Sequence, residues 1–310
     1  MAAKSLVVVG SVNADLVLPI ERLPQPGETL GASSLETLPG GKGANQAAAA
    51  AKLGYPTYFV GQIGTDANAP LLKAAMREAG ADLAHLKDVP GPSGTALILL
   101  QANGENSIII VGGANQAAWD LTPGAKAAVG GAGAVLLQRE IPESVNVQVA
   151  QLAKAAGVPV FLDAGGVEGP ISHDLLACVT LLSPNETELA RLTGLPTDDE
   201  AQIRSAAEAL QKLGVGSVLV KLGGDGSLLL PGGGGEPIRQ KAIPAPKVVD
   251  TTGAGDCFTA AYAVAVLQGR VGADALRFAS AAASICVTRK GAMPSLPSRI
   301  EVDALLASHQ

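Results

Sequence analysis

Leu6-Val7-Val8-Val9-Gly10 is an unbroken apolar run that stops at a glycine. Such a run, without polar alternation, is typical of a strand buried on both faces of a sheet that helices cover. Further runs of this kind are Thr57–Val60, Val135–Gln138, Val158–Leu162, Val179–Leu182 and Val218–Leu222. Helical stretches alternate with them: Ala44–Leu53, Ala69–Ala79, Glu143–Ala156, Asp199–Leu213, Ala254–Leu267 and Ala273–Val287. The alternation predicts an α/β fold with a doubly wound, mostly parallel sheet sandwiched by helices, in a single domain of residues 1–310.

Two segments interrupt the alternation, at about residues 13–40 and 95–111. The first is extended and contains three prolines. The second reads as two strands, Thr95–Gln101 and Ser107–Val111, around a turn that contains Asn103-Gly104. Asn-Gly is a strong hairpin signal. We expect the two segments to combine into a small β-sheet that projects as a lid; two separate surface hairpins are the alternative.

The composition argues against several classes of protein. The 310 residues carry 22 basic and 28 acidic side chains, a net charge of −6, with 3% aromatics; nucleic-acid binding favours basic stripes and stacking rings instead. No uninterrupted apolar run reaches the roughly 18 residues of a membrane span. Three widely spaced cysteines (178, 257 and 286) fit a reducing compartment. We expect no nucleic acid, no membrane, and a cytoplasmic location, or an organelle stroma such as that of a plastid if a transit peptide has been removed.

The strongest local motif is Asp250-Thr-Thr-Gly-Ala-Gly-Asp256, which leads into the apolar helix 257–267. Glycines before a helix let backbone N–H groups converge, and the helix dipole favours an anion there. Beside a transferring phosphoryl group, the Asp256 carboxylate could accept the proton of an attacking hydroxyl. A plain N-cap on a glycine-rich loop is the alternative for this aspartate.

A second motif, Gly40-Gly41-Lys42-Gly43-Ala44-Asn45-Gln46, precedes an alanine-rich helix. It is not a P-loop, because Glu36 stands where the first glycine is required. Lys42 and Asn45 offer donors of the kind that hydroxyl-rich ligands need. Asn13 and Asp15 follow the first strand, where open α/β sheets bind ligands, and could hold a sugar diol. The tetrapeptide Ala-Asn-Gln-Ala recurs at 114–117, which we interpret as a coincidence of two helix junctions.

A third motif, Asn185-Glu-Thr-Glu188, follows the strand 179–182. An Asn with Glu three residues later is an ordinary capping box at a helix start. The functional alternative places Asn185 and Glu188 near Mg²⁺, mostly through water, since Mg²⁺ dehydrates reluctantly.

Taken together, these motifs resemble the two signatures and the N-x-x-E motif of the ribokinase/PfkB family of sugar kinases. Further matches are Gly10-Ser-Val-Asn-Ala-Asp15, Pro26-Gly-Glu-Thr29 and Val287-Thr-Arg-Lys-Gly-Ala-Met-Pro-Ser295, within the branch that phosphorylates ribose. The resemblance spans roughly residues 6–307, with the motifs in the expected order.

The resemblance implies a role for each matching position. The ribose-contacting positions are Asn13, Asp15, Gly41, Lys42, Asn45 and Glu140. The catalytic base is Asp256, and the anion hole for the γ-phosphate is Gly253, Ala254 and Gly255. The nucleotide-contacting positions are Asn185, Lys221, Gly223, Gly224, Asp225, Gly226, Gly255 and Ser280. The monovalent-cation site, for K⁺, comprises Asp250, Thr252, Cys286, Arg289, Gly291 and Ser295.

Three departures from the family pattern stand out. Arg139 occupies a usually apolar position, and strand alternation should point it away from the sugar. Asp163-Ala-Gly-Gly166 replaces the commoner Asn-Pro-Ala-Pro loop. Lys221 replaces a more usual Thr near the nucleotide phosphates, where we expect a positive charge to be tolerated and to tighten ATP binding.

The resemblance therefore implies a kinase that uses ATP, Mg²⁺ and K⁺ to convert D-ribose into ribose 5-phosphate. The exposed edges of the lid sheet favour a homodimer. A phosphofructokinase-like enzyme would need more cations for its substrate phosphate, and a nucleoside kinase would need apolar cover for a base. A 2-deoxyribose kinase and a non-catalytic sugar-binding protein remain as alternatives.

Overall fold

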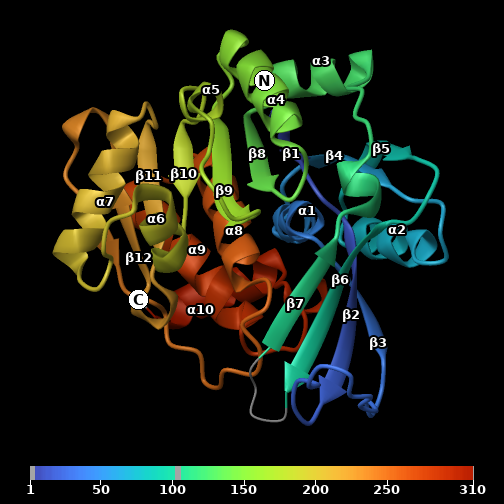
Figure 1. Ribbon diagram of the computed structural model, residues 1–310. Helices are drawn as coiled ribbons and strands as arrows, with labels where there is room; N and C mark the ends of the chain where they lie inside the picture. The colour runs from blue at the N-terminus through green and yellow to red at the C-terminus, as the bar shows by residue number, and fades with distance from the viewer. Residues whose placement is uncertain (1–3, 102–105, 310) are drawn as a thin grey trace.

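The computed structural model describes residues 4–101 and 106–309. Its main sheet has nine strands in the order β13-β12-β11-β10-β9-β8-β1-β4-β5, in which every neighbouring pair is parallel except β11–β12 and β12–β13 (Figure 1). These strands are β1 (Leu6–Val9), β4 (Thr57–Ile63), β5 (Asp82–Asp88), β8 (Ala134–Arg139), β9 (Val160–Gly166), β10 (Leu181–Ser183), β11 (Ser217–Lys221), β12 (Ser227–Leu230) and β13 (Ile238–Gln240). The predicted doubly wound, mostly parallel sheet is confirmed, and the turn residues 102–105 lie outside the described residues.

Helices cover both faces of this sheet. They are α1 (Lys42–Lys52), α2 (Ala69–Glu78), α3 (Pro123–Gly131), α4 (Glu143–Ala155), α5 (His173–Leu176), α6 (Glu186–Thr193), α7 (Glu200–Lys212), α8 (Ala254–Leu267), α9 (Gly272–Cys286) and α10 (Arg299–Ser308). Successive strand residues point to opposite faces: in β1, Leu6 and Val8 pack with α1, α2, α8, α9 and α10, whereas Val7 and Val9 pack with α3 to α7. The continuous apolar run of β1 is therefore explained by burial on both sides.

The two interrupting segments form a second sheet of four strands, in the order β3-β2-β6-β7. Its strands are β2 (Asn13–Ile20), β3 (Glu36–Gly40), β6 (Gly94–Gln101) and β7 (Asn106–Val111). Strands β2 and β6 run parallel, and the outer pairs are antiparallel. Figure 1 shows this sheet extending below α1, away from the main sheet. The predicted small lid sheet is thus confirmed, since the two segments pair with each other.

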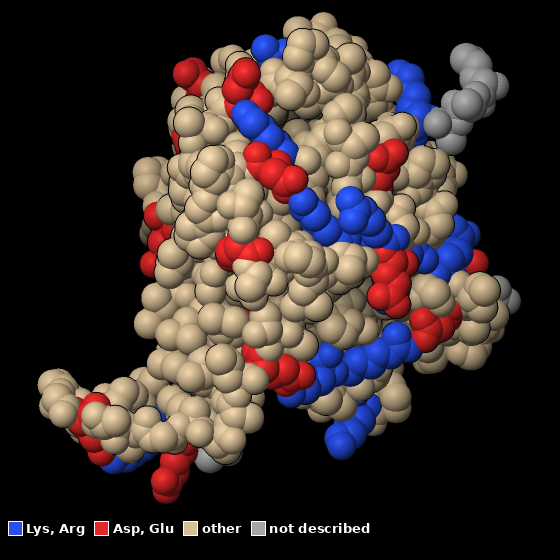
Figure 2. Space-filling model, turned by 90° about the vertical axis from the view of Figure 1, so that its right-hand side faces the viewer, with Lys and Arg blue, Asp and Glu red and all other residues tan. Residues whose placement is uncertain are grey.

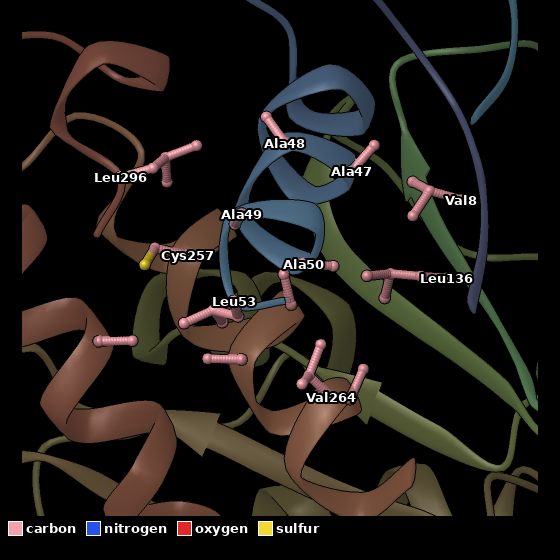
Figure 3. Close-up of a cluster of buried hydrophobic side chains, with 14 of the residues drawn as sticks. Val8, Ala47, Ala48, Ala49, Ala50, Leu53, Leu136, Cys257, Val264 and Leu296 are labelled. Atoms are coloured by element: carbon pink, nitrogen blue, oxygen red, sulfur yellow. The ribbon is translucent and has the colours of Figure 1, made fainter. Parts of the chain in front are cut away.

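Helix α1 lies between the main sheet and helix α8. Figure 3 shows its alanines, among them Ala47 and Ala50, between Val8 and Leu136 of the sheet and Val264 of α8. All of these side chains are buried. Because alanine adds only a methyl group, the two helix backbones can approach closely. This packing holds the first turns of α1 and α8 side by side.

Surface charge is mixed on the face of Figure 2, where Lys and Arg alternate with Asp and Glu over a largely uncharged background. Within residues 4–101 and 106–309, no helix is long and apolar enough to cross a membrane. All three cysteines are free thiols: Cys257 and Cys286 are fully buried, and Cys178 is partly exposed.

Candidate active site

The site forms where the strand order changes direction. After β1 the chain passes to β4 on one side, and it later returns to β8 on the other. Ligands of open α/β sheets bind at the carboxyl ends of strands at such a point. Here Ser11, just after β1, donates its hydroxyl to Glu140, just after β8, at 2.6 Å. The same carboxylate accepts the backbone N–H of Lys42 at 3.0 Å.

Asn13 and Asp15 reach this point from the small sheet. They are two residues apart on β2, so both side chains lie on the same face, and both are buried. A methyl group at Gly40 would lie 2.0 Å from an oxygen of Asp15, and one at Gly94 would lie 2.3 Å from Oδ1 of Asn13. The glycines of the flanking strands therefore make room for the two polar side chains.

The first turn of α1 supplies Lys42 and Asn45. Gly41 precedes the helix with a φ of 90°, a left-handed conformation that favours glycine. Asn45 donates through Nδ2 to Oδ2 of Asp256, the third residue of α8, at 2.9 Å. Oδ1 of Asn45 is buried and has no protein partner within the described chain. The close packing of α1 on α8 thus leaves one amide oxygen free for a ligand.

Asp256 lies in the first turn of α8, directly after Gly253, Ala254 and Gly255. Gly253 adopts a φ of 77° before the helix, as the predicted glycine loop requires. Burial raises the pKa of Asp256 to about 6; Lys42 opposes this rise and Asp163 adds to it. A carboxylate with such a pKa at the start of a helix can act as a proton acceptor near neutral pH.

The neighbouring ionisable groups are strongly perturbed as well. Burial, together with the charges of Glu140 and Asp256, raises the pKa of Asp15 to about 7. The charge of Asp256, supported by Asp163 and Glu140, holds the pKa of the Lys42 ammonium well above its usual value despite burial. Perturbed titrations of this kind cluster at functional sites.

A cavity of about 600 Å³ opens on the other side of Lys42 and Asp256. Most nucleotide positions expected from the sequence line it: Asn185, Lys221, Gly223, Gly224, Gly226, Gly255 and Ser280. Gly253 and Ala254 of the expected anion hole line it as well. Ser280 also accepts the backbone N–H of Ile243 at 3.0 Å. Asp225 is exposed and lies outside this lining. Lys42 and Asp256 belong both to the cavity and to the polar group around Asp15, so the two halves of the site meet there.

Asn185 and Glu188 form a capping box at the start of α6. The Asn185 side chain accepts the N–H of Glu188 at 2.7 Å, and Glu188 accepts the N–H of Asn185 at 2.8 Å. Both residues also line the cavity. The capping box expected as one reading of this motif is therefore present, and Glu188 lines the same cavity as Gly223, Gly224 and Gly226.

Two of the three departures from the family pattern meet in the cavity. Lys221, at the end of β11, forms an ion pair with Asp163 of β9 at 2.8 Å between Nζ and Oδ2. Asp163 also accepts the hydroxyl of Thr259 at 2.8 Å. Burial alone would raise the pKa of Asp163, but the charges of Lys221 and Lys42 hold it below its usual value. The third departure, Arg139, donates to the carbonyl of Pro170, as expected of a side chain that points away from the sugar position.

The residues expected around a monovalent cation fall into two neighbouring groups. Asp250 accepts the backbone N–H of Thr252 at 2.9 Å and that of Gly291 at 2.8 Å. Cys286 and Ser295 lie 2.9 Å apart, Sγ to Oγ. Arg289 instead forms an ion pair with Glu301. The loop before the glycine motif is thus tied to the loop after α9.

Sequence reasoning missed two residues of this site. Asn115 accepts the N–H of Val12 at 3.0 Å and donates to Oδ1 of Asn13 at 2.7 Å, so it fixes the strand that presents Asn13. Gln46 points Nε2 at both Asp163 and Asp256, at 3.4 Å from each carboxylate. Gln46 lies in the first copy of Ala-Asn-Gln-Ala and Asn115 in the second, at different positions of the tetrapeptide, so the recurrence gave no signal for either role.

The chain matches the family described as pfkB family carbohydrate kinase over residues 3–299. It is 55% identical over 309 residues to a ribokinase of Arabidopsis thaliana, which covers 98% of this chain and 81% of the relative. It is 36% identical over 300 residues to a ribokinase of Haemophilus influenzae, with 96% and 97% covered.

The fold is shared with solved structures of such enzymes. A structure of Arabidopsis thaliana ribokinase complexed with ribose and ATP superposes with a TM-score of 0.94 at 55% identity, covering 98% of this chain and 99% of that one. The arrangement of the two sheets and the site between them is therefore that of a structure known to hold a sugar and a nucleotide together.

Proposed function

Because the chain belongs to the pfkB family of carbohydrate kinases, we propose that it transfers the γ-phosphoryl group of ATP to the 5-hydroxyl of D-ribose. The observation that carries this proposal is the position of Asp256. It lies where the cavity of about 600 Å³ meets the buried polar residues of β2 and α1. A sugar on one side and a triphosphate on the other would have their reacting atoms at this carboxylate.

Asp256 accepts the proton of the attacking 5-hydroxyl. As the new bond from the sugar oxygen to phosphorus forms, the bond from phosphorus to the leaving oxygen of ADP breaks. Gly253, Ala254 and Gly255 lie at the N-terminus of α8. The Ala254 N–H donates to the Thr251 carbonyl at 3.2 Å, so the N–H groups of Gly253 and Gly255, together with the helix dipole, stabilise the charge that develops on the transferred group. The pKa of about 6 leaves Asp256 mostly ionised at neutral pH and ready to take the proton.

The sugar diol binds to Asp15, Asn13 and Asn45. The free, buried Oδ1 of Asn45 supports this assignment, because a buried amide oxygen without a partner is costly unless a ligand hydroxyl donates to it. Asp15, with a pKa of about 7, can accept from a hydroxyl when ionised. The glycines opposite Asp15 and Asn13 make room for these two side chains themselves, which keeps their polar atoms at the site.

Magnesium fits the donors around Asn185 and Glu188. Mg²⁺ in kinases is held by one or two carboxylates, by water and by the substrate phosphates. Glu188 lines the nucleotide cavity and is not part of an ion pair within the described residues, so its carboxylate suits a water-mediated contact. A bound Mg²⁺ would neutralise the phosphate charge during transfer.

A potassium ion fits between the loop that starts at Asp250 and the loop that contains Gly291. Oxygen donors, carbonyls included, suit such a hard cation. The hydrogen bonds of Asp250 already tie the two loops together, and Ser295 lies beside Cys286 at the same junction. An ion there would fix the backbone that leads into Gly253.

A homodimer is proposed through the edge of the small sheet. Strand β7 ends the order β3-β2-β6-β7, so among residues 4–101 and 106–309 no strand pairs with its outer side. Ile108, Ile109, Ile110 and Val111 are each 52–54% exposed on this strand. Open apolar edges of this kind favour pairing with another chain.

An ADP-release assay over a panel of sugars tests the proposed reaction. D-ribose should exceed 2-deoxyribose in kcat/KM by about 5–150-fold, because the missing hydroxyl leaves buried polar atoms unpaired. Equal or faster turnover of 2-deoxyribose would favour the deoxyribose kinase instead. Sugar binding without ADP release would favour the non-catalytic alternative.

A further inference from the structure

We propose that Lys221 is a further catalytic residue that binds the transferring γ-phosphoryl group, and that Asp163 is the residue that positions it. This inference rests on the proposed kinase reaction and assigns Asp163 a role that the family resemblance did not imply. It also assigns Lys221 one defined contact, to the phosphate that moves, where the sequence suggested only a place near the nucleotide.

The position of Lys221 supports a direct contact. Its ammonium lies at the cavity, and a methyl group at Gly255 would be 3.7 Å from Nζ. The ammonium therefore stands over the glycine loop at the start of α8, one residue before Asp256. A phosphoryl group bound to the N–H groups of that loop would lie within reach of Lys221.

Asp163 has more hydrogen-bond partners than Lys221. Oδ2 of Asp163 accepts from Lys221 at 2.8 Å and from Thr259 at 2.8 Å, and Oδ1 accepts the N–H of Gly165 at 2.9 Å. Gln46 also donates through Nε2 to Oδ2 at 3.4 Å. The carboxylate is thus held by four donors, and only 2% of its side chain is exposed. Lys221 has three N–H donors, and within the described residues its hydrogen-bond acceptor is Oδ2 of Asp163. Donors remain for a ligand in the cavity.

Electrostatic balance gives a reason for a lysine here. Around the point of transfer lie the acidic side chains of Asp15, Glu140, Asp163 and Asp256. Two ammonium groups, those of Lys42 and Lys221, oppose their charge. Without Lys221, a single ammonium would face these carboxylates and the incoming triphosphate. A buried Asp–Lys pair is also weak evidence for a stabilising role, because desolvation of both charges offsets their attraction.

During transfer, Lys221 donates hydrogen bonds to oxygens of the γ-phosphoryl group and keeps its proton. The proton of the sugar hydroxyl goes to Asp256, and the electrons of the breaking bond leave on the oxygen of ADP. Asp163 does not touch the phosphate; it fixes the lysine side chain over the loop. Because ADP lacks the γ-phosphate, the contact should distinguish ATP from ADP.

Lys221→Met tests the phosphate contact, with Lys212→Met on the exposed end of α7 as the control. We expect Lys221→Met to lower kcat by about 10²–10³-fold. Its affinity for a non-hydrolysable ATP analogue, measured by calorimetry, should fall at least about tenfold, and its affinity for ADP less than about threefold. Equal weakening of both nucleotides, or a kcat above about one third of the wild-type value, would overturn the proposal.

Asp163→Asn and the double variant Asp163→Asn/Lys221→Met test the positioning role. Asp163→Asn should lower kcat about tenfold alone but less than about twofold in the Lys221→Met background, since its effect passes through the lysine. A purely structural role would give additive losses. The double variant buries no unpaired charge, so it decides the nucleotide contrast if Lys221→Met alone does not fold: a lost preference for the ATP analogue supports the proposal, and a retained preference overturns it.

The wild-type enzyme separates this inference from the proposed function. If the wild type turns over D-ribose and Lys221→Met has the same kcat and the same nucleotide preference, the inference fails and the kinase assignment stands. If wild type shows no sugar-dependent ADP release, the proposed function fails, and an unchanged ATP-analogue-to-ADP preference in Lys221→Met would overturn the inference separately.

Discussion

At the scale of single residues, opposing influences on one carboxylate set the chemistry of the site. Burial raises the pKa of Asp256, and Lys42 and the amide of Asn45 lower it, with a result near 6. If burial acted alone, the pKa of Asp256 would be so high that the group would be protonated at neutral pH and could not act as a base. If Lys42 acted alone, the pKa would be so low that the carboxylate would be a poor proton acceptor. The same cluster holds Asp15 near 7 and Asp163 below its usual value, so each carboxylate has a different ionisation.

Asp256→Asn should lower kcat by about 10²–10⁴-fold, because the amide keeps the size of the side chain but cannot take the proton. Binding of ATP, measured by calorimetry, should be nearly unchanged. In the wild type, the acid limb of kcat/KM should fall as pH drops through about 6, where Asp256 becomes protonated. A variant with more than about a third of wild-type kcat would remove Asp256 from the mechanism.

Asp15→Asn should stabilise the ligand-free protein while it weakens ribose binding. The folded pKa of about 7 lies above the ordinary pKa of 3.8 for an exposed aspartate, so the folded state binds a proton more tightly than the unfolded one. Stability therefore falls as pH rises from about 4 to 7, and the asparagine removes this cost. We expect a gain of about 2–4 kcal/mol at pH 8 that shrinks toward pH 4.

Thermal unfolding of both proteins between pH 4 and 8 measures this difference. Asp88→Asn is the matched control, because that carboxylate is exposed at the end of β5. A melting temperature for Asp15→Asn that stays below the wild-type value at pH 8 would contradict the assigned ionisation.

At the scale of elements, the buried strands, the helices between them and the exposed strand β7 could be predicted, whereas some other exposed elements could not. Helix α8 has the predicted bounds, Ala254–Leu267, and β1 has the predicted Leu6–Val9. Strand β5 was missed because Asp82–Asp88 is an edge strand with polar, partly exposed side chains that lack an apolar run. Helix α10 (Arg299–Ser308) was missed, although Ser298 and Glu301 form a capping box, which is a sequence signature of a helix N-terminus.

Site residues were predictable where the motif itself carries them and not where distant elements meet. Gly41, Asn45 and Asp256 occur in recognisable motifs. The pairing of Asp163 with Lys221 joins residues 58 positions apart on strands that are not neighbours, since β10 lies between β9 and β11. In the sequence, Asp163 and Lys221 are two separate departures from the family pattern. In the folded sheet their side chains form one ion pair.

Potassium should raise activity several-fold over sodium at matched ionic strength with Mg²⁺ present, because an ion between the loops of Asp250 and Gly291 would fix the N–H groups that follow Gly253. Initial rates in K⁺, Na⁺ and tetramethylammonium chloride measure the effect. Asp250→Asn should reduce the ratio of rates in K⁺ and Na⁺ toward one. Identical wild-type rates in all three salts would refute the cation site and leave the kinase assignment intact.

At the scale of the whole molecule, the site is built from two sheets that each supply part of it. The main sheet and its helices provide Asp256 and the nucleotide cavity, and the small sheet provides Asn13 and Asp15. Strand β7, at the end of the small sheet, places the proposed dimer contact on the same sheet that carries Asn13 and Asp15.

Ile109→Lys should convert a dimer to a monomer, because it places a charge in the middle of the apolar edge formed by Ile108–Val111. Size-exclusion chromatography with light scattering measures the mass directly. Val271→Lys serves as the control, since Val271 is 79% exposed on the main body, just before α9. A wild-type protein that is monomeric at micromolar concentration would refute the dimer.

Because two cysteines are buried, the rate at which their thiols are alkylated can report how often helix α8 opens. Cys257 follows Asp256 on α8 and Cys286 ends α9, and neither thiol touches solvent, whereas Cys178 is partly exposed. An alkylating reagent should therefore modify Cys178 in the folded protein and reach Cys257 only when α8 separates from its neighbours. The rate at which Cys257 becomes alkylated, with and without ribose and ATP, would report how often the catalytic helix leaves its place and how firmly its substrates hold it there.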